Sequence, residues 1–131
     1  MLLWTLDLGG AVPGKAIQRT TYAVGVIGTD ERNLIQAANV IVLAQEALGR
    51  YLIQIERLGA LEWRLLFATE TFHHEIRKSQ IEYVIGADHD ATTAAIDAYL
   101  PVLEARNWTA TEVFQLSDQM AVIHAIRRVA V

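Results

Sequence analysis

Cysteine is absent from this 131-residue chain. Its absence excludes disulfide frameworks, thiolate zinc sites and cysteine nucleophiles. Proline is scarce, at two residues, and we expect no internal repeats or low-complexity segments. Charged residues make up only 20% of the chain, against 53% hydrophobic residues. A small protein with this balance tends to leave apolar surface exposed, and such surface usually marks an interaction site.

Clusters of positive charge are also missing. The formal net charge is −4, and the eleven basic residues are spread from Lys15 to Arg128 in runs of at most two. Binding to nucleic acid depends on a basic patch that neutralises phosphates. We therefore expect no nucleic-acid partner.

No segment has the character of a membrane span. The most apolar long stretch, residues 34–58, carries polar or charged side chains throughout its length, and these would be costly in a bilayer. The N-terminus lacks a basic start, carries Asp7 and breaks at Gly9-Gly10, so it does not have the layout of a signal peptide. These features predict a soluble protein without a membrane partner, located in the cytoplasm or within a particle assembled inside the cell.

The length predicts one domain covering residues 1–131, because a chain of this size can bury a substantial core. Within it, residues 2–8 alternate between apolar and other side chains, and residues 20–27 are β-branched, aromatic and again alternating. Turn-forming residues separate the two segments. We therefore expect residues 1–28 to form a β-hairpin or an extended arm.

From residue 30 onward the apolar spacing is that of a helix. Thr29 or Asp30 is suited to cap its start. Leucine and isoleucine then recur every seven residues, and a second apolar series follows three positions later. The first series is Leu34, Ile41, Leu48 and Ile55, and the second is Ala37, Ala44, Tyr51 and Leu58. This pattern predicts a long helix over residues 30–58.

Three more helices are expected after Gly59, over residues 60–85, 90–106 and 110–129. The short connection at Gly59 favours an antiparallel hairpin of the first two helices over one kinked rod. Asp88 or Asp90 could cap the third helix, and Thr109-Ala110-Thr111-Glu112 matches a capping box for the fourth. The predicted fold is therefore mainly α: a four-helix antiparallel bundle over residues 29–131, with a long helical hairpin and the N-terminal hairpin or arm.

The segment from Glu70 to Glu75 contains the sequence's candidate metal ligands. Glu70, His73 and His74 include one Glu-x-x-His spacing, which places a carboxylate and an imidazole on one helix face. A two-metal bundle normally carries this spacing on two helices, and here it occurs once. A solvated helix face is the favoured interpretation, and we expect no bound cofactor.

The remaining histidines fit structural roles better than catalytic ones. His124 lies in an apolar run, where a lone histidine is usually a hydrogen-bonded core or interface residue whose protonation could make assembly pH-sensitive. His89, between Asp88 and Asp90, fits a loop and its cap. The sequence contains no hydrolase elbow, phosphate-binding loop or dinucleotide fingerprint, so no catalytic residue is assigned.

The apolar excess favours a non-catalytic protein: a homo-oligomerising structural or adaptor subunit of a larger assembly, a class that includes virion and phage components. Other subunits of such an assembly are further expected partners. The alternative is a helical bundle that binds a metal or small ligand through the Glu70–Glu75 segment, a class that includes enzymes. The expected interface residues are Leu34, Ile41, Leu48, Tyr51, Ile55, Trp63 and Phe67.

Overall fold

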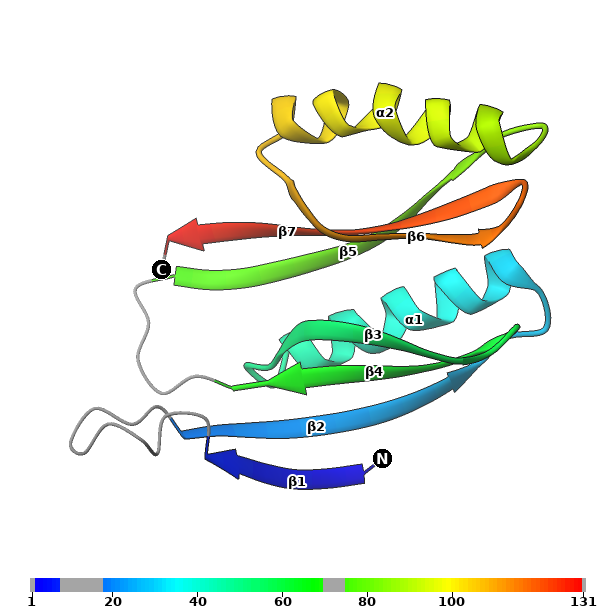
Figure 1. The fold of residues 1–131 in the computed structure, drawn as a ribbon. Coiled ribbons are helices and arrows are strands. Elements are labelled where there is room, and N and C mark those ends of the chain that lie inside the picture. The colour runs from blue at the N-terminus through cyan, green and yellow to red at the C-terminus, as the bar shows by residue number, and fades with distance from the viewer. Residues whose placement is uncertain (1, 8–17, 70–74, 131) are drawn as a thin grey trace. The chain divides into compact units, whose positions relative to one another are not determined.

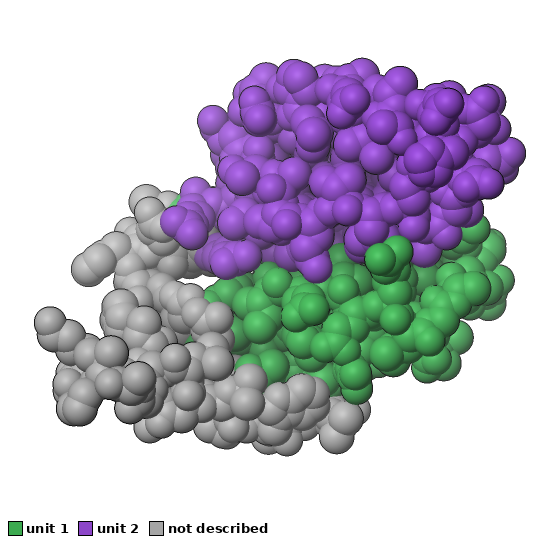
Figure 2. All heavy atoms as spheres, viewed as in Figure 1, with its two compact units in different colours: residues 1–76, 129–131 green, residues 77–128 purple. Residues whose placement is uncertain are grey.

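The computed structural model describes residues 2–7, 18–69 and 75–130, and it describes side chains at 21–69 and 77–129. The chain divides into two compact units (Figure 2). Unit 1 comprises residues 1–76 and 129–131, and unit 2 comprises residues 77–128. The prediction that residues 1–131 form one domain stays a prediction.

Unit 1 contains a four-stranded antiparallel sheet with one helix packed against it (Figure 1). Its elements are β1 (Leu2–Asp7), β2 (Gln18–Ile27), α1 (Glu31–Glu46), β3 (Tyr51–Gly59) and β4 (Glu62–Ala68). The strand order is β1-β2-β4-β3, and α1 contacts β2, β3 and β4. β1 pairs antiparallel with β2, so the predicted N-terminal hairpin is present and forms one side of the larger sheet.

Unit 2 contains a three-stranded sheet with its own helix. The strands are β5 (Glu75–Ile85), β6 (Thr109–Ser117) and β7 (Met120–Ala130), in the order β5-β7-β6, and the helix is α2 (His89–Ala105). The strands β5 and β7 extend slightly beyond the unit's bounds. Leu103 packs with Ile123 and Ala125 at the centre of this core. Partly buried residues surround them: Val84, Ile96, Tyr99, Leu100, Trp108 and Ala110.

The predicted mainly α four-helix bundle is wrong, because the described residues are mostly β and form two helices. The predicted helix at 30–58 ends at Glu46, where the chain turns through Gly49 with a φ of 78°. A positive φ is the conformation in which glycine commonly terminates helices. The following residues, from Tyr51, form strand β3 and pair antiparallel with β4. The seven-residue spacing therefore runs by coincidence across a helix and a strand.

The predicted helices at 60–85 and 110–129 are likewise wrong. The first is replaced by β4 and β5, and the second by β6 and β7. Neither the helical hairpin nor the kinked rod exists, because Ala60-Leu61 is the turn of a β-hairpin. The supposed capping box from Thr109 to Glu112 is the start of strand β6. β-branched and aromatic residues in these segments gain more from cross-strand pairing than from an isolated helical turn.

The third predicted helix is confirmed, since α2 occupies residues 89–105 within about one residue of the expected range. Both helices start as expected from aspartates. The Asp30 carboxylate accepts from the backbone N–H of Asn33, and that of Asp88 accepts from Ala91, each at 2.8 Å. The short-range capping chemistry in the sequence therefore places both helix starts correctly.

The two units repeat one arrangement, strand-helix-strand-strand, with a constant sequence offset. β2-α1-β3-β4 corresponds to β5-α2-β6-β7, and the sheet orders β2-β4-β3 and β5-β7-β6 match. Equivalent positions lie 58 residues apart, and include Gly28 and Gly86, Asp30 and Asp88, and Leu61 and Gln119. The backbone N–H of Gly28 donates to the carbonyl of Leu61, and Gly86 donates to Gln119 in the same way. The structure thus contains a repeat that the sequence analysis missed.

Candidate functional sites: a buried histidine network and an exposed apolar helix face

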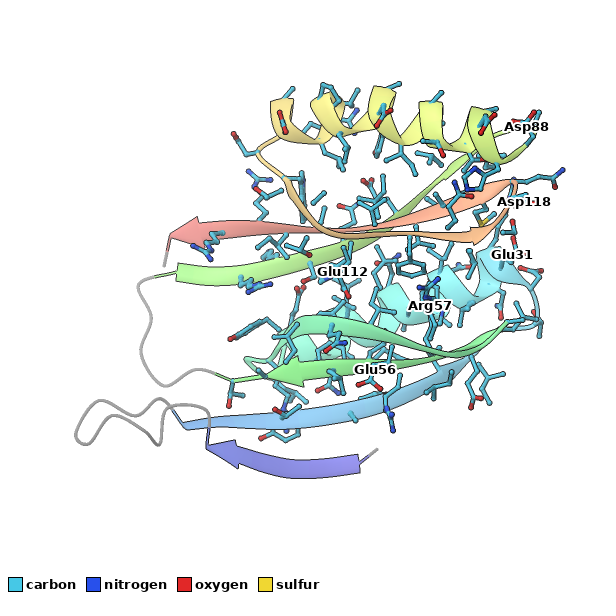
Figure 3. All side chains as sticks on the ribbon, viewed as in Figure 1. Glu31, Glu56, Arg57, Asp88, Glu112 and Asp118 are labelled. Atoms are coloured by element: carbon cyan, nitrogen blue, oxygen red, sulfur yellow. The ribbon has the colours of Figure 1, made fainter. Side chains whose placement is uncertain are left out.

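His124 forms a hydrogen-bonded chain that joins all three strands of unit 2. Its Nδ1 lies 2.8 Å from Glu112 Oε2 on β6, and its Nε2 lies 3.0 Å from Ser79 Oγ on β5. His124 itself is on β7, the central strand. Strand alternation places its ring on the face opposite Ile123 and Ala125, which pack toward α2. Glu112 is labelled in Figure 3 on that same side of the sheet.

The protonation pattern of this chain follows from its donors and acceptors. An ionised carboxylate only accepts hydrogen bonds, so His124 Nδ1 carries a hydrogen and donates to Glu112. In the neutral imidazole, Nε2 then accepts from the Ser79 hydroxyl. The Thr111 hydroxyl donates to the carbonyl oxygen of His124 at 3.1 Å and connects β6 to β7 a second time.

A carboxylate, a histidine and a serine in this order are also the groups that activate a serine nucleophile. Here, however, the His124 ring has no exposed surface, and Ser79 is only 7% exposed. Both side chains are therefore inaccessible to a substrate in this structure. The geometry therefore favours a structural role, in which one residue from each strand holds the three strands in register. This is the hydrogen-bonded histidine that the apolar context of His124 predicts.

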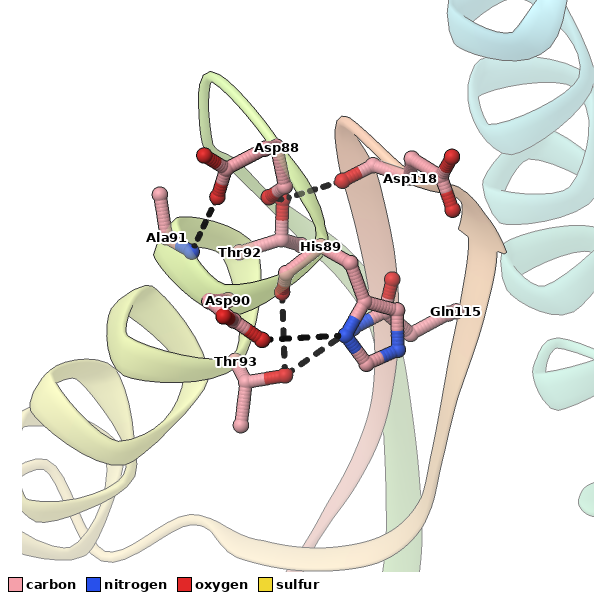
Figure 4. Close-up of polar contacts among 8 residues, drawn as sticks. All are labelled: Asp88, His89, Asp90, Ala91, Thr92, Thr93, Gln115 and Asp118. Carbon is pink, nitrogen blue, oxygen red and sulfur yellow. Dashed lines mark hydrogen bonds and ion pairs between the residues drawn. The ribbon is translucent and has the colours of Figure 1, made fainter.

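A second polar cluster lies where α2 begins (Figure 4). The Thr92 hydroxyl lies 2.8 Å from the carbonyl oxygens of Asp88 and Asp118, so it connects the first turn of the helix to the turn between β6 and β7. Gln115 Nε2 donates to the Thr93 hydroxyl from β6. His89 lies 3.6 Å from Asp90 within the same turn, on the surface. The Thr92 and Gln115 contacts position the helix end. His89, predicted to lie in a loop and its cap, is instead the first residue of α2, one position after the capping Asp88.

The outer face of α1 is the unusual surface of unit 1. Its buried residues, Leu34, Ile35, Ala38 and Val42, lie on one side of the helix. From residue 36 to the end of the following turn, the exposed residues are Gln36, Val40, Leu43, Ala44, Ala47, Leu48 and Gly49. None of them is charged, although the outer face of a surface helix is normally polar. We call Val40, Leu43, Ala44, Ala47 and Leu48 the α1 stripe.

The exposed fractions in the α1 stripe are large. They reach 62% for Val40, 66% for Leu43 and 63% for Leu48. Single exposed hydrophobic residues are common on soluble proteins, but a contiguous row along one helix is informative. The sequence analysis chose Leu48 and missed Val40 and Leu43. The spacing of residues 36, 40, 43, 44 and 47 places them on one face of a helix and could have identified this exposed surface. The prediction relied instead on the seven-residue apolar series.

Most of the expected interface residues lie in the interior. Leu34, Tyr51, Ile55, Trp63 and Phe67 are buried, Ile41 is half-buried, and Leu48 is exposed. The first five are therefore core side chains in this structure. A role of these residues in subunit contacts stays a prediction.

The candidate metal ligands Glu70, His73 and His74 lie outside the described residues. Within residues 18–69 and 75–130, no group of three or more histidine, aspartate or glutamate residues is placed to hold a metal ion. Over the same ranges, neither helix has the length and apolar content needed to cross a membrane. No protein family, curated protein or solved structure matches this chain. Its function is therefore argued from its own surfaces.

Proposed function

We propose that this protein is a non-catalytic, self-associating structural or adaptor subunit, and that the α1 stripe contacts a second copy of the chain. The observation that carries the proposal is the row of exposed apolar side chains on a helix face without charge. Burying a leucine or valine side chain stabilises a contact by about 1.5–3 kcal/mol relative to full exposure. In a two-fold contact each residue of the stripe is buried twice, once on each copy.

The chemistry of the stripe supports a helix of the same kind as its occupant. Ala44 and Ala47 are small and lie between the larger Val40, Leu43 and Leu48. Alternating small and large side chains allow two helices to approach closely and interdigitate. A charged partner surface would lose its hydration against this stripe without gaining an ion pair.

The test is the solution mass of the wild-type chain and of Leu43→Lys, measured by analytical ultracentrifugation over a range of concentrations. The wild type is expected to exceed the 14.6 kDa of one chain, and Leu43→Lys is expected to raise the dissociation constant at least roughly tenfold. Leu43 is exposed, so the fold should survive the change.

A matched control is Val102→Lys, which adds the same charge at an exposed apolar position on α2. This variant is expected to associate like the wild type. The proposal is wrong if the wild type is monomeric at high micromolar concentration, or if both lysine variants associate equally well.

A further inference from the structure

The repeat shows that the two units differ at one equivalent sheet edge. In unit 1, β1 pairs antiparallel along β2, with Leu2–Asp7 opposite residues 18–23. The counterpart of β2 in unit 2 is β5, and among the described strands β5 is the last in its sheet on that side. In unit 1 the strand-helix-strand-strand framework therefore carries an additional antiparallel strand beside β2. The equivalent position in unit 2 is the outer edge of β5, which can pair with a strand in the same way.

The side chains on the α2 side of β5 carry unpaired charges of opposite sign. Tyr99 on α2 donates to Glu82, which places Glu82, and with it Lys78 and Gln80, on that face. The Glu82 carboxylate accepts from two neutral donors, Gln80 Nε2 at 2.8 Å and the Tyr99 hydroxyl at 3.0 Å. Its second oxygen is buried without a hydrogen-bond partner. Lys78 is exposed, and neither Lys78 nor Glu82 forms an ion pair within the described residues.

We propose that β5 pairs antiparallel with β5 of a second copy, with the two-fold axis at Gln80. This pairing deepens the proposed function, on which it rests, by adding a second contact of the same assembly. In this register Lys78 of one copy lies directly opposite Glu82 of the other, and the pair occurs twice. Residues directly opposite across an antiparallel pair have Cβ atoms about 4.5–5.5 Å apart, close enough for ion pairing. Two three-stranded sheets then become one continuous six-stranded sheet, with both α2 helices on the same face.

Among the two-fold registers centred on residues 78 to 82, only the one at Gln80 places Lys78 opposite Glu82. Moving the axis to Ser79 or Ile81 leaves Lys78 opposite Gln80 or Val84 in place of Glu82. About Gln80, each copy places a cation opposite the other copy's anion, and the two glutamine amides meet at the axis. Charges on an edge strand normally hinder pairing with other strands. On β5 the register about Gln80 gains two opposite-charge pairs, whereas the registers about Lys78 or Glu82 set like charges opposite each other and those about Ser79 or Ile81 gain no such pair.

Covalent trapping tests the geometry directly. The chain has no cysteine, so Gln80→Cys introduces one thiol at the two-fold axis. Under mild oxidation this variant is expected to form a disulfide-linked dimer of twice 14.6 kDa. The matched control is Gln54→Cys, an exposed position on β3, which is the edge strand of the other sheet. Cross-linking of Gln80→Cys no faster than Gln54→Cys would overturn the proposal.

Charge exchange tests the register. Lys78→Glu and Glu82→Lys each convert two opposite-charge pairs into two like-charge pairs, so each alone is expected to weaken this contact at least roughly tenfold. An equimolar mixture of the two variants restores both pairs and is expected to form heterodimers. Circular dichroism checks that each variant is folded. If Glu82→Lys does not fold, Lys78→Glu in the Gln80→Cys background replaces it, and loss of the cross-link is then the expected result.

The outcomes separate this contact from the one through the α1 stripe. Retained cross-linking of Gln80→Cys in a Leu43→Lys background supports two independent contacts. An oligomer that depends on Leu43 but does not cross-link at Gln80 refutes the β5 pairing alone. A cross-linked dimer whose mass is insensitive to Leu43→Lys refutes the α1 contact alone, and a wild-type monomer without cross-linking refutes both.

Discussion

His124 Nδ1 lies 2.8 Å from the Glu112 carboxylate, across the pairing of β7 with β6. Removing the acceptor leaves the imidazole N–H without this partner in a ring that has no exposed surface. Glu112→Ala is therefore expected to lower the free energy of unfolding by about 1–3 kcal/mol, and Glu112→Gln, which keeps an acceptor, by less. Urea denaturation measures both. Glu104→Ala, at an exposed position on α2, is the control, and an equal loss in all three variants would contradict the structural role of the pair.

Gly28 and Gly86 should resist substitution because the helices pack against them. A Cβ at Gly28 would come within 2.6 Å of the Cα of Leu34, and one at Gly86 would come closer still to the backbone of Thr92. Backbone atoms cannot move aside cheaply, so Gly28→Ala and Gly86→Ala are each expected to cost about 1–3 kcal/mol of stability. Gly25→Ala, where no atom lies within 4 Å of the added methyl, serves as the control. In thermal unfolding, the melting temperature should fall clearly for Gly28→Ala and Gly86→Ala and should stay close to that of the wild type for Gly25→Ala.

Gly49 and Asn107 occupy equivalent positions after the two helices, with φ values of 78° and 65°. Asparagine adopts this left-handed conformation more readily than other residues with a side chain. Gly49→Asn is therefore expected to retain most of the wild-type stability, whereas Gly49→Ala should lose about 1 kcal/mol. Chemical denaturation of the two variants side by side tests this, and an alanine that is tolerated better than asparagine would argue against the equivalence.

Tyr99 should make stability depend on alkaline pH. Burial, and then the hydrogen bond to Glu82 and the negative charge of that residue, raise the pKa of the Tyr99 phenol above its ordinary value of 10.0. The folded state therefore favours the neutral phenol, and this contribution is complete below the unfolded pKa and is lost as the pH rises through the folded pKa.

The measurement is the free energy of unfolding from pH 8 upward for the wild type and Tyr99→Phe. The wild type is expected to lose stability more steeply above about pH 10. Tyr83→Phe controls for the loss of a phenol elsewhere. Parallel curves for the wild type and Tyr99→Phe would show that Tyr99 does not contribute.

Parts of the fold were predictable because they depend on neighbouring residues. Asp30 and Asp88 each accept from a backbone N–H three residues ahead, and such caps are visible in sequence. The repeat was visible as well, since Val-Ile-Gly-x-Asp occurs at 26–30 and again at 84–88. Few other residues match at the 58-residue offset, which explains why composition alone did not show the repeat.

The strands β3 to β7 were less predictable, because their residues satisfy more than one pattern. Leu34, Ile41, Leu48 and Ile55 keep a seven-residue spacing although a helix, a turn and a strand divide them. Residues 121–126 are buried without interruption, and a continuous apolar run of this kind fits a buried strand or a buried helix equally well. Only the pairing partner, far along the chain, decides between the two.

In the candidate sites, too, the sequence predicted some features and strand pairing decided the others. The apolar surroundings of His124 predicted a hydrogen-bonded histidine, but its partners Ser79 and Glu112 lie 45 and 12 residues away and meet it only through strand pairing. The sequence by itself determined the helix starts, the N-terminal hairpin, the absence of thiol chemistry and the excess of apolar residues. Only the tertiary structure decided which apolar residues are buried, that Val40 and Leu43 face outward, and which strand forms an open edge. Burial and strand pairing are contacts between segments that lie far apart in the sequence, and local propensity does not encode such contacts.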